Sequence, residues 1–128
     1  MRQIQKMSDA EMEVMKVVWR CGGSITSPAL HQELSKTREW KQNTVITFLS
    51  RLTDKGIITA EKQGRGKPSR YVARLTEEEY KRCETMAFLD AVHGGSMASL
   101  MTALCGNEEP TRAQLGELKA WFESMDKG

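Results

Sequence analysis

The side chains best suited to acid–base or metal chemistry are few and lie far apart in the chain. They are two histidines and three cysteines, His31, His93, Cys21, Cys83 and Cys105. No H-x-x-x-H or C-x-x-C pattern joins them, and Gly64-x-Gly66 is too short for a phosphate-binding loop. We therefore predict no catalytic activity, no bound metal and no cofactor. The alternative left open is that these five residues assemble into a metal sensor across a dimer.

A second set of side chains suits hydrogen bonding to DNA bases. It recurs at helical spacing and comprises Asn43, Thr47, Ser50 and Asp54, with Ile46 and Arg51 at its edges. The opposite line is apolar and comprises Val45, Phe48, Leu49 and Leu52. Asn can pair with an adenine edge, and the methyl groups of Thr and Ile can meet a thymine methyl. The alternative is a polar helix face that is merely solvated.

Cations surround this helix in the sequence. The segment 62–70 carries Lys62, Arg65, Lys67 and Arg70, with Gly64 and Gly66 between them. Lys36, Arg38 and Lys41 add charge before the helix, and Arg51 adds charge on it. A flexible cationic loop beside a base-contacting helix suits phosphate or minor-groove contact. We predict Lys41, Arg51, Lys62, Arg65 and Lys67 as DNA-backbone contacts.

Three helices and a hairpin must position these residues. Ser8-Asp9-Ala10-Glu11 forms a capping box for a helix that Gly22-Gly23 ends. Ser27-Pro28 predicts the N-cap and first residue of a short second helix, and Gly56 ends the third. The segments 57–60 and 70–75 predict the two strands of a hairpin. Residues 1–75 are thus predicted as a winged helix-turn-helix domain in a mainly α chain with a small β-hairpin.

Residues 76–128 predict three further helices with broad apolar faces. Thr76-Glu77-Glu78-Glu79 and Thr111-Arg112-Ala113-Gln114 are capping boxes, and Gly94-Gly95 separates two helices. About 50 residues can hardly bury such faces alone, so we predict a helical dimerisation region. Its predicted interface is Phe88, Leu100, Leu104, Leu115, Leu118, Trp121, Phe122 and Met125. The alternative is that these helices fold back on residues 1–75 in a monomer.

Charge separates the two regions. The chain of 128 residues holds 19 Lys+Arg and 17 Asp+Glu, a net charge of +2. Residues 1–75 hold 14 and 7 of these, a net charge of +7, whereas residues 76–128 hold 5 and 10, a net charge of −5. Such asymmetry is typical of a basic binding domain joined to another region. No apolar run suits a membrane span or a signal peptide, and the odd number of distant cysteines argues against disulfides, so we expect a reduced cytoplasmic protein.

The sequence resembles the penicillinase-repressor (BlaI/MecI/CopY) family of winged-helix regulators. The resemblance rests on four stretches: 4–19 with its Val18-Trp19, 34–40 with its Trp40, Asn43-Thr44-Val45, and 49–56. The basic loop and the returning Tyr71 fit as well. The similarity covers nearly the whole chain and is strongest over residues 4–75.

The resemblance implies a homodimeric repressor that binds a palindromic operator and controls antibiotic-resistance-type or metal-stress genes. It implies that Thr44 and the helix residues after it enter the major groove. It places Trp40 near the DNA backbone and assigns the wing contacts to Lys62, Arg65 and Lys67. The alternatives are a winged-helix module that binds a protein and a sensor that binds a metal or small molecule directly.

Three positions depart from the family pattern. A membrane-linked metalloprotease pathway cleaves penicillin-responsive members at an Asn-Phe bond, and the matching pair here is Ala103-Leu104. Copper-responsive members carry paired C-x-C motifs near the C-terminus, and no cysteine follows Thr111 here. The family often has Ser-Pro before the third helix, and this chain has Lys41-Gln42, which predicts a weaker N-cap.

Overall fold

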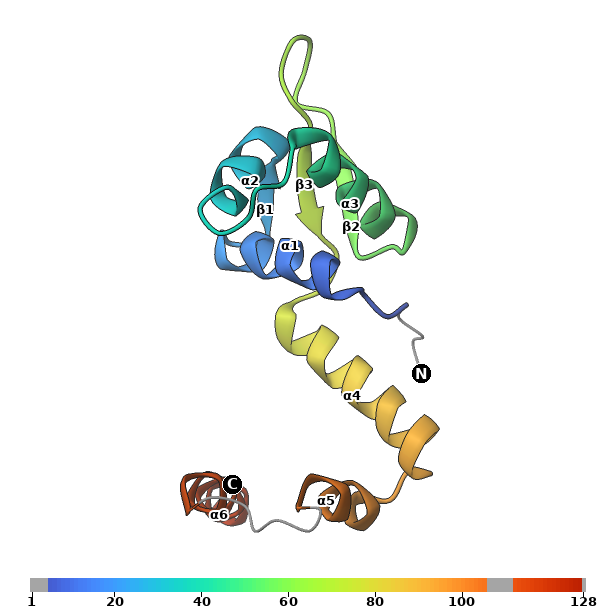
Figure 1. Ribbon diagram of the computed structural model, residues 1–128, viewed down its shortest axis with the longest axis vertical. Helices are drawn as coiled ribbons and strands as arrows, with labels where there is room; N and C mark the ends of the chain where they lie inside the picture. Colours follow the sequence, from blue (N-terminus) through green and yellow to red (C-terminus); the bar gives the residue numbers. More distant parts are fainter. Residues whose placement is uncertain (1–4, 106–111, 128) are drawn as a thin grey trace. The chain divides into compact units, whose positions relative to one another are not determined.

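The computed structural model describes residues 5–105 and 112–127, which fall into two compact units. The first unit spans Met1–Met86 and the second Ala87–Gly128. The elements are mostly helices with one small sheet (Figure 1). In chain order they are α1 (Asp9–Arg20), β1 (Ser24–Thr26), α2 (Ser27–Leu34), α3 (Gln42–Asp54), β2 (Ile58–Glu61), β3 (Arg70–Ala73), α4 (Glu77–His93), α5 (Met97–Cys105) and α6 (Arg112–Lys127).

Helix α1 begins and ends where its sequence predicts. The Ser8 hydroxyl accepts from the Glu11 N–H at 3.2 Å, and the Glu11 carboxylate accepts from the Ser8 N–H at 2.9 Å, which completes the capping box. Gly22 and Gly23 follow the helix with φ of 89° and 93°. These angles are costly for a residue with a Cβ, so the glycines end α1 and turn the chain into β1.

Helix α2 begins one residue earlier than predicted. Thr26, not Ser27, is the N-cap, and its hydroxyl accepts from the Ala29 N–H at 3.4 Å. Pro28 still lies in the first turn, where the missing N–H costs nothing. The Ser-Pro pattern therefore located the first turn but not the cap, because Thr26 can cap equally well while it pairs in β1.

Helix α3 has a weak start and a well-defined end. Lys41 occupies the N-cap and makes no side-chain capping bond, which confirms the weaker cap predicted from Lys41-Gln42. At the other end the Lys55 N–H donates to the Arg51 carbonyl, and Gly56 has a φ of 76°. The N-terminus of α3 must therefore be fixed by contacts other than its own cap.

The sheet has three antiparallel strands in the order β1-β3-β2, so the predicted two-stranded hairpin is incomplete. Strand β1 pairs Ile25 with Tyr71, and β2 pairs Ala60 with Tyr71 from the other side. Strand β1 is only three residues long, and although Ile25 alternates with Ser24 and Thr26, three residues are too few to predict a strand. The hairpin strands themselves lie at 58–61 and 70–73, close to the predicted 57–60 and 70–75.

One apolar core holds the three N-terminal helices against the sheet. Its most completely buried side chains are Val14, Met15, Val18, Leu30, Val45, Leu49, Leu52, Ile57, Ile58 and Tyr80. Tyr80 lies in the first turn of α4, so the compact unit continues past Leu75 into that helix. The division at Leu75 into a DNA-binding domain and a dimerisation region stays a functional prediction.

The second unit contains the last residues of α4 together with α5 and α6. Gly94 and Gly95, with φ of 58° and 80°, end α4 as predicted. Residues of α5 and α6, including Met101, Leu104, Leu118 and Trp121, line an apolar groove of about 410 Å³. The capping box predicted at Thr111 lies outside the described residues, whereas the one at Thr76 and Glu79 forms.

Among the residues that the structure describes, none of the helices is both long enough and apolar enough to cross a lipid bilayer.

Candidate nucleic-acid interface

Helix α3 presents a polar face to solvent, opposite its core face. Asn43, Ile46, Thr47 and Ser50 are exposed, and Thr44 is half-buried at the edge of this face. The other side of α3 carries Val45, Leu49 and Leu52, which are fully buried. This burial confirms the prediction of which face of α3 packs on the core. Ile46 is 41% exposed and places an apolar group among the polar ones. These side chains form a surface that can contact base edges in a DNA groove.

Thr47 is held in one conformation by its own helix. Its hydroxyl donates to the Asn43 carbonyl at 2.9 Å. The hydroxyl hydrogen is therefore used within the helix, and the outward-facing groups are an oxygen lone pair and the methyl group. Thr47 can thus accept from an exocyclic amino group of adenine or cytosine, or contact a thymine methyl.

Trp40 holds the turn that precedes α3. Its ring packs on Phe48 with centroids 5.1 Å apart, and the Arg38 guanidinium lies 5.4 Å above the ring centroid. His31 Nε2 lies 2.9 Å from the Trp40 carbonyl oxygen, at hydrogen-bonding distance. These contacts fix the start of α3 in place of a side-chain cap. No local pattern indicated this positioning role, because the partners come from α2, the turn and α3.

The cations near α3 divide into two groups. Arg38 pairs with Glu13 at 2.6 Å and Lys36 with Glu33 at 3.1 Å, so both are neutralised within the protein. By contrast, five exposed cations have no ion pair within the described part of the chain: Lys41, Arg51, Lys62, Arg65 and Lys67. Of these cations, only the second group can bind a phosphate without first leaving a carboxylate.

The wing is the loop 62–69 between β2 and β3, and its residues up to Pro68 are all exposed. Gly64 and Gly66 have φ of 125° and 78°, and the Lys67 N–H donates to the Gly64 carbonyl at 3.2 Å. The glycines allow a turn that side chains would hinder, so the lysines and the arginine stand on a narrow, extended tip. Figure 1 shows the wing projecting beyond the sheet.

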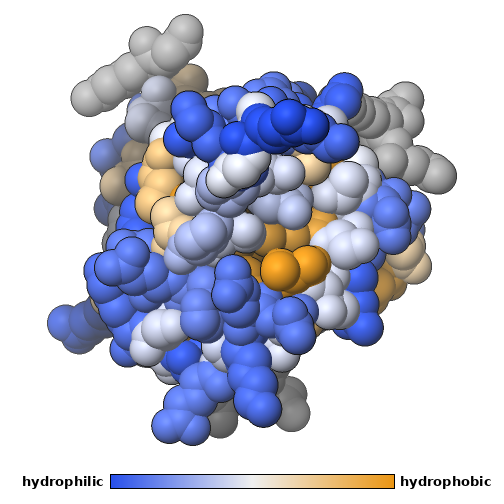
Figure 2. Space-filling view, turned by 90° about the horizontal axis from the view of Figure 1, so that it is seen from above, coloured by the Kyte–Doolittle hydropathy of each residue, from blue (hydrophilic) through white to orange (hydrophobic). Residues whose placement is uncertain are grey.

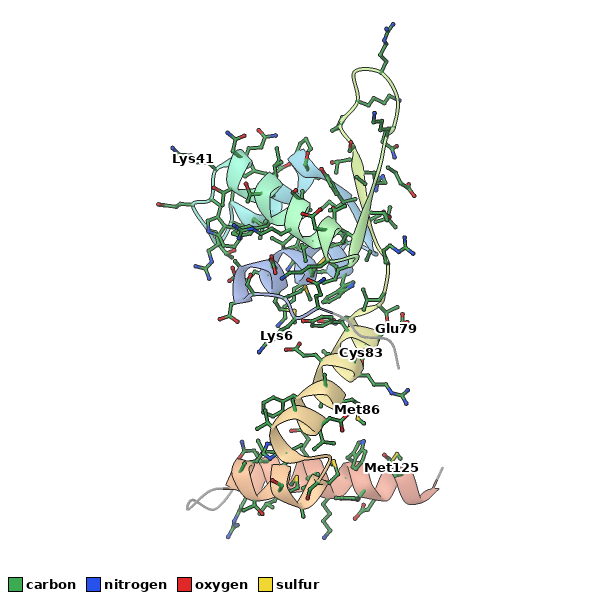
Figure 3. All side chains as sticks on the ribbon, turned by 90° about the vertical axis from the view of Figure 1, so that its right-hand side faces the viewer. Lys6, Lys41, Glu79, Cys83, Met86 and Met125 are labelled. Carbon is green, nitrogen blue, oxygen red and sulfur yellow. The ribbon has the colours of Figure 1, made fainter. Side chains whose placement is uncertain are left out.

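Lys41, at the start of α3, and the wing lie toward one end of the first unit. Figure 3 shows Lys41 pointing outward at the end of this unit where the wing projects, whereas Lys6 and Glu79 lie at the opposite end. Figure 2, viewed from the wing end, shows a mainly hydrophilic surface with a small apolar area in it. A cationic, hydrogen-bonding surface with few apolar groups suits DNA better than it suits a protein partner.

The cysteines and histidines do not come together in the described residues. Cys21 is exposed and Cys83 half-buried, and both are free thiols. No group of three His, Cys, Asp or Glu side chains in residues 5–105 and 112–127 could hold a metal ion. The side chain of Cys105 lies outside the part of the chain that the structure describes.

Fold and surface together define a winged-helix DNA-binding protein. The sequence profile of the penicillinase repressor family matches residues 7–124. The chain belongs to that family.

Individual relatives agree with this assignment. A penicillinase repressor of Bacillus licheniformis is 34% identical over 118 residues, which cover 92% of this chain and 90% of that protein. A penicillinase repressor of Staphylococcus aureus is 28% identical and covers 95% of this chain and 94% of its own length. The solution structure of the DNA-binding domain of the repressor BlaI superposes with a TM-score of 0.53 at 41% identity, covering 62% of this chain and 94% of that domain.

Proposed function

We propose that this chain is a transcriptional repressor that binds a palindromic operator as a homodimer. The observation that carries the proposal is the exposed polar face of α3 flanked by five unpaired cations. Supporting it, the solution structure of monomeric Bacillus licheniformis BlaI in complex with the blaP half-operator matches 62% of this chain at 40% identity and a TM-score of 0.52. A single copy of the matched region therefore suffices for half-site binding in that protein.

The contacts to DNA divide into two kinds in this proposal. Asn43, Thr44, Ile46, Thr47 and Ser50 contact bases, whereas Trp40, Lys41, Arg51, Lys62, Arg65 and Lys67 contact the backbone. Because Trp40 is half-buried on Phe48, only the exposed edge of its ring can contact the DNA backbone. Two such domains would occupy half-sites about 10 base pairs apart, one turn of the double helix.

The proposed dimer forms through the apolar side chains of the second unit. Phe88, Leu104, Leu115, Trp121, Phe122 and Met125 are each 47–70% exposed in the single chain, and Leu100 and Leu118 are half-buried. Exposed apolar side chains of this number are unusual in a monomer and mark an interaction surface. A second copy is the partner that a palindromic operator requires.

Binding of the full chain to the DNA upstream of its own gene tests the proposed function. A salt-titrated gel shift should give specific binding at least about a thousandfold tighter than binding to random duplex. Equal affinity for both duplexes would reject sequence-specific repression. An in vivo reporter fused to the same promoter would then show the repression itself.

Because the partner is chromosomal DNA, the proposal places the protein in the cytoplasm.

Arg65→Ala should weaken binding to all duplexes alike. Arg65 is exposed on the wing and has no ion pair in the described chain, so its loss removes a phosphate contact without disturbing the fold. We expect the slope of log K against log salt to decrease by about one unit per subunit. Arg82→Ala, an exposed arginine of α4, is the matched control and should leave the slope unchanged. A wild-type slope in Arg65→Ala would exclude the wing contact.

Thr47→Ala should change the choice among operators. It removes the acceptor and the methyl group that α3 presents, and we expect discrimination at one base-pair position to fall by about 1–3 kcal/mol. Thr53→Ala is the matched control, because Thr53 makes the same bond to a carbonyl four residues earlier but lies in the last turn of α3. Equal losses on specific and random DNA would show that Thr47 does not contact bases.

The regulated genes are proposed as antibiotic-resistance-type or metal-stress genes on the strength of family membership. We do not propose proteolytic induction, because the pair that matches the family's Asn-Phe cleavage bond is Ala103-Leu104. Ala103 and Leu104 lie inside helix α5, where cleavage of a peptide bond first requires the helix to unfold locally.

A further inference from the structure

The N-terminal segment, residues 5–8, is joined to two distant elements by hydrogen bonds at neighbouring residues. The Met7 N–H donates to the Tyr80 hydroxyl at 3.0 Å, across 73 positions of sequence. The Lys55 ammonium donates to the Lys6 carbonyl at 2.9 Å, across 49 positions. The segment thereby connects the residue that ends α3 with the first turn of α4.

The α4 end of this connection is buried and fixed. Tyr80 is 1% exposed, and its ring lies beside Trp19 with centroids 6.0 Å apart. The Trp19 indole N–H donates to the Leu75 carbonyl at 3.0 Å, just before α4 begins. Burial raises the pKa of the Tyr80 hydroxyl, and the nearby Glu84 carboxylate acts in the same direction. The neutral hydroxyl accepts from the Met7 N–H through an oxygen lone pair.

The α3 end is an ion pair with a second bond. Lys55 is the C-cap residue of α3, and its ammonium lies 2.5 Å from Glu11 Oε1 as well as against the Lys6 carbonyl. The same carboxylate oxygen accepts from the Ser8 N–H. The end of α3, the start of α1 and the N-terminal segment therefore form a single polar network.

This network lies away from the proposed DNA surface. Lys6 and Glu79 mark its end of the unit, opposite Lys41 and the wing (Figure 3). None of its groups is needed to contact DNA directly. What the network can do is hold the first half of α4 at a fixed position relative to α3, and α4 continues along the chain into the proposed dimerisation region.

We propose that Lys55 and Tyr80 are positioning residues that couple α3 to α4 through the N-terminal segment, and so set the half-site spacing that the dimer accepts. The inference rests on the proposed function, because it requires a dimer on a palindrome. A rigid link keeps two α3 helices in one relative placement. A loosened link lets them accommodate half-sites that are rotated or shifted.

The test measures tolerance to spacing with the full chain. The probes are a palindrome selected by the wild-type protein from a random duplex pool, the same palindrome with one base pair inserted at its centre, and its single half. The insertion rotates the half-sites by roughly 34° and separates them by about 3.4 Å. The wild type should lose at least about tenfold in affinity on the inserted site. Tyr80→Phe and Lys55→Gln should each lose at most about threefold, with half-site affinity unchanged.

Two controls separate positioning from general damage. Tyr71→Phe removes a hydroxyl from a half-buried tyrosine of β3, and Lys16→Gln removes an exposed ammonium from α1; both should keep the wild-type discrimination. If Tyr80→Phe and Lys55→Gln also keep it, or lose affinity equally on all three probes, the coupling is refuted. If the wild type itself prefers the palindrome no more than its half, the dimeric function fails instead.

Discussion

Replacing Lys55 with methionine is expected to destabilise the first unit by about 3 kcal/mol, which lowers its melting temperature by roughly 15 °C. The Lys55 ammonium lies 2.5 Å from Glu11 Oε1, and the Glu11 side chain is only 2% exposed. Without Lys55, this carboxylate keeps its charge in a buried site with the Ser8 N–H as its remaining strong partner. An uncompensated buried charge is costly because neither water nor a counterion stabilises it.

Thermal and urea unfolding of the full chain measure this effect. Lys16→Met is the matched control, since Lys16 is an exposed lysine of α1 with no ion pair in the described residues. It should change stability by no more than about 0.5 kcal/mol. Adding Glu11→Gln to Lys55→Met should recover part of the loss, because it removes the unpaired charge. A Lys55→Met protein as stable as the control would show that the pair contributes little.

The stability that Lys55→Met loses should also depend on pH. Burial raises the pKa of the Glu11 carboxyl. The hydrogen bonds from Lys55 and Ser8, together with the Lys55 charge, lower this pKa by a larger amount, so that it lies below its ordinary 4.5. A pKa lowered by folding stabilises the protein above the unfolded value, and this stabilisation is lost as pH falls through the lowered value. Removing Lys55 raises the folded pKa. The deficit of Lys55→Met should therefore be greatest at neutral pH and shrink toward pH 4 and below.

Sequence alone located the elements whose signals are local. The capping box at Ser8, the paired glycines at 22–23 and the apolar line through Val45 each depend on a few neighbouring residues, and each appears in the structure as predicted. Strand β1 was missed because it exists only through pairing with β3, 46 positions later. The cap of α2 was misplaced by one residue because Thr26 and Ser27 are adjacent and either type can cap a helix.

The polar surface of α3 was predictable for the same reason, since helical spacing alone separates Thr47 from Leu49. The ion pairing of the nearby cations was not predictable to the same extent. Lys36 and Arg38 add to the positive charge in the sequence, but Glu33 and Glu13 neutralise them, and Glu13 lies 25 positions from Arg38. Likewise Trp40 packs on Phe48 beneath Arg38, a contact that no spacing rule indicates. The pairing of Arg38 spans a long sequence distance that spacing does not indicate, whereas Lys36 and Glu33 are only three residues apart.

Phe122→Asp is expected to abolish the dimer while leaving each subunit folded. Phe122 is 57% exposed in the single chain and lies on one face of α6 with Leu115, Leu118 and Met125, at spacings of three and four residues. An aspartate there costs little in the monomer, because water still reaches it. In the proposed interface it would bury an unpaired charge, at a cost of about 3 kcal/mol. Two-fold symmetry counts this cost twice, so the dimer should dissociate about 10⁴-fold more readily.

Sedimentation across a range of concentrations measures the dimer, and gel shifts on a full palindrome and on its single half measure the consequence for DNA. Ala120→Asp is the matched control, because Ala120 is exposed on the opposite side of α6 and receives the same charge. Phe122→Asp should bind the half-site as the wild type does but bind the palindrome no more tightly than a half-site. The two half-site affinities are combined only while the subunits are joined. A Phe122→Asp protein that remains dimeric would place the interface on another face of the second unit.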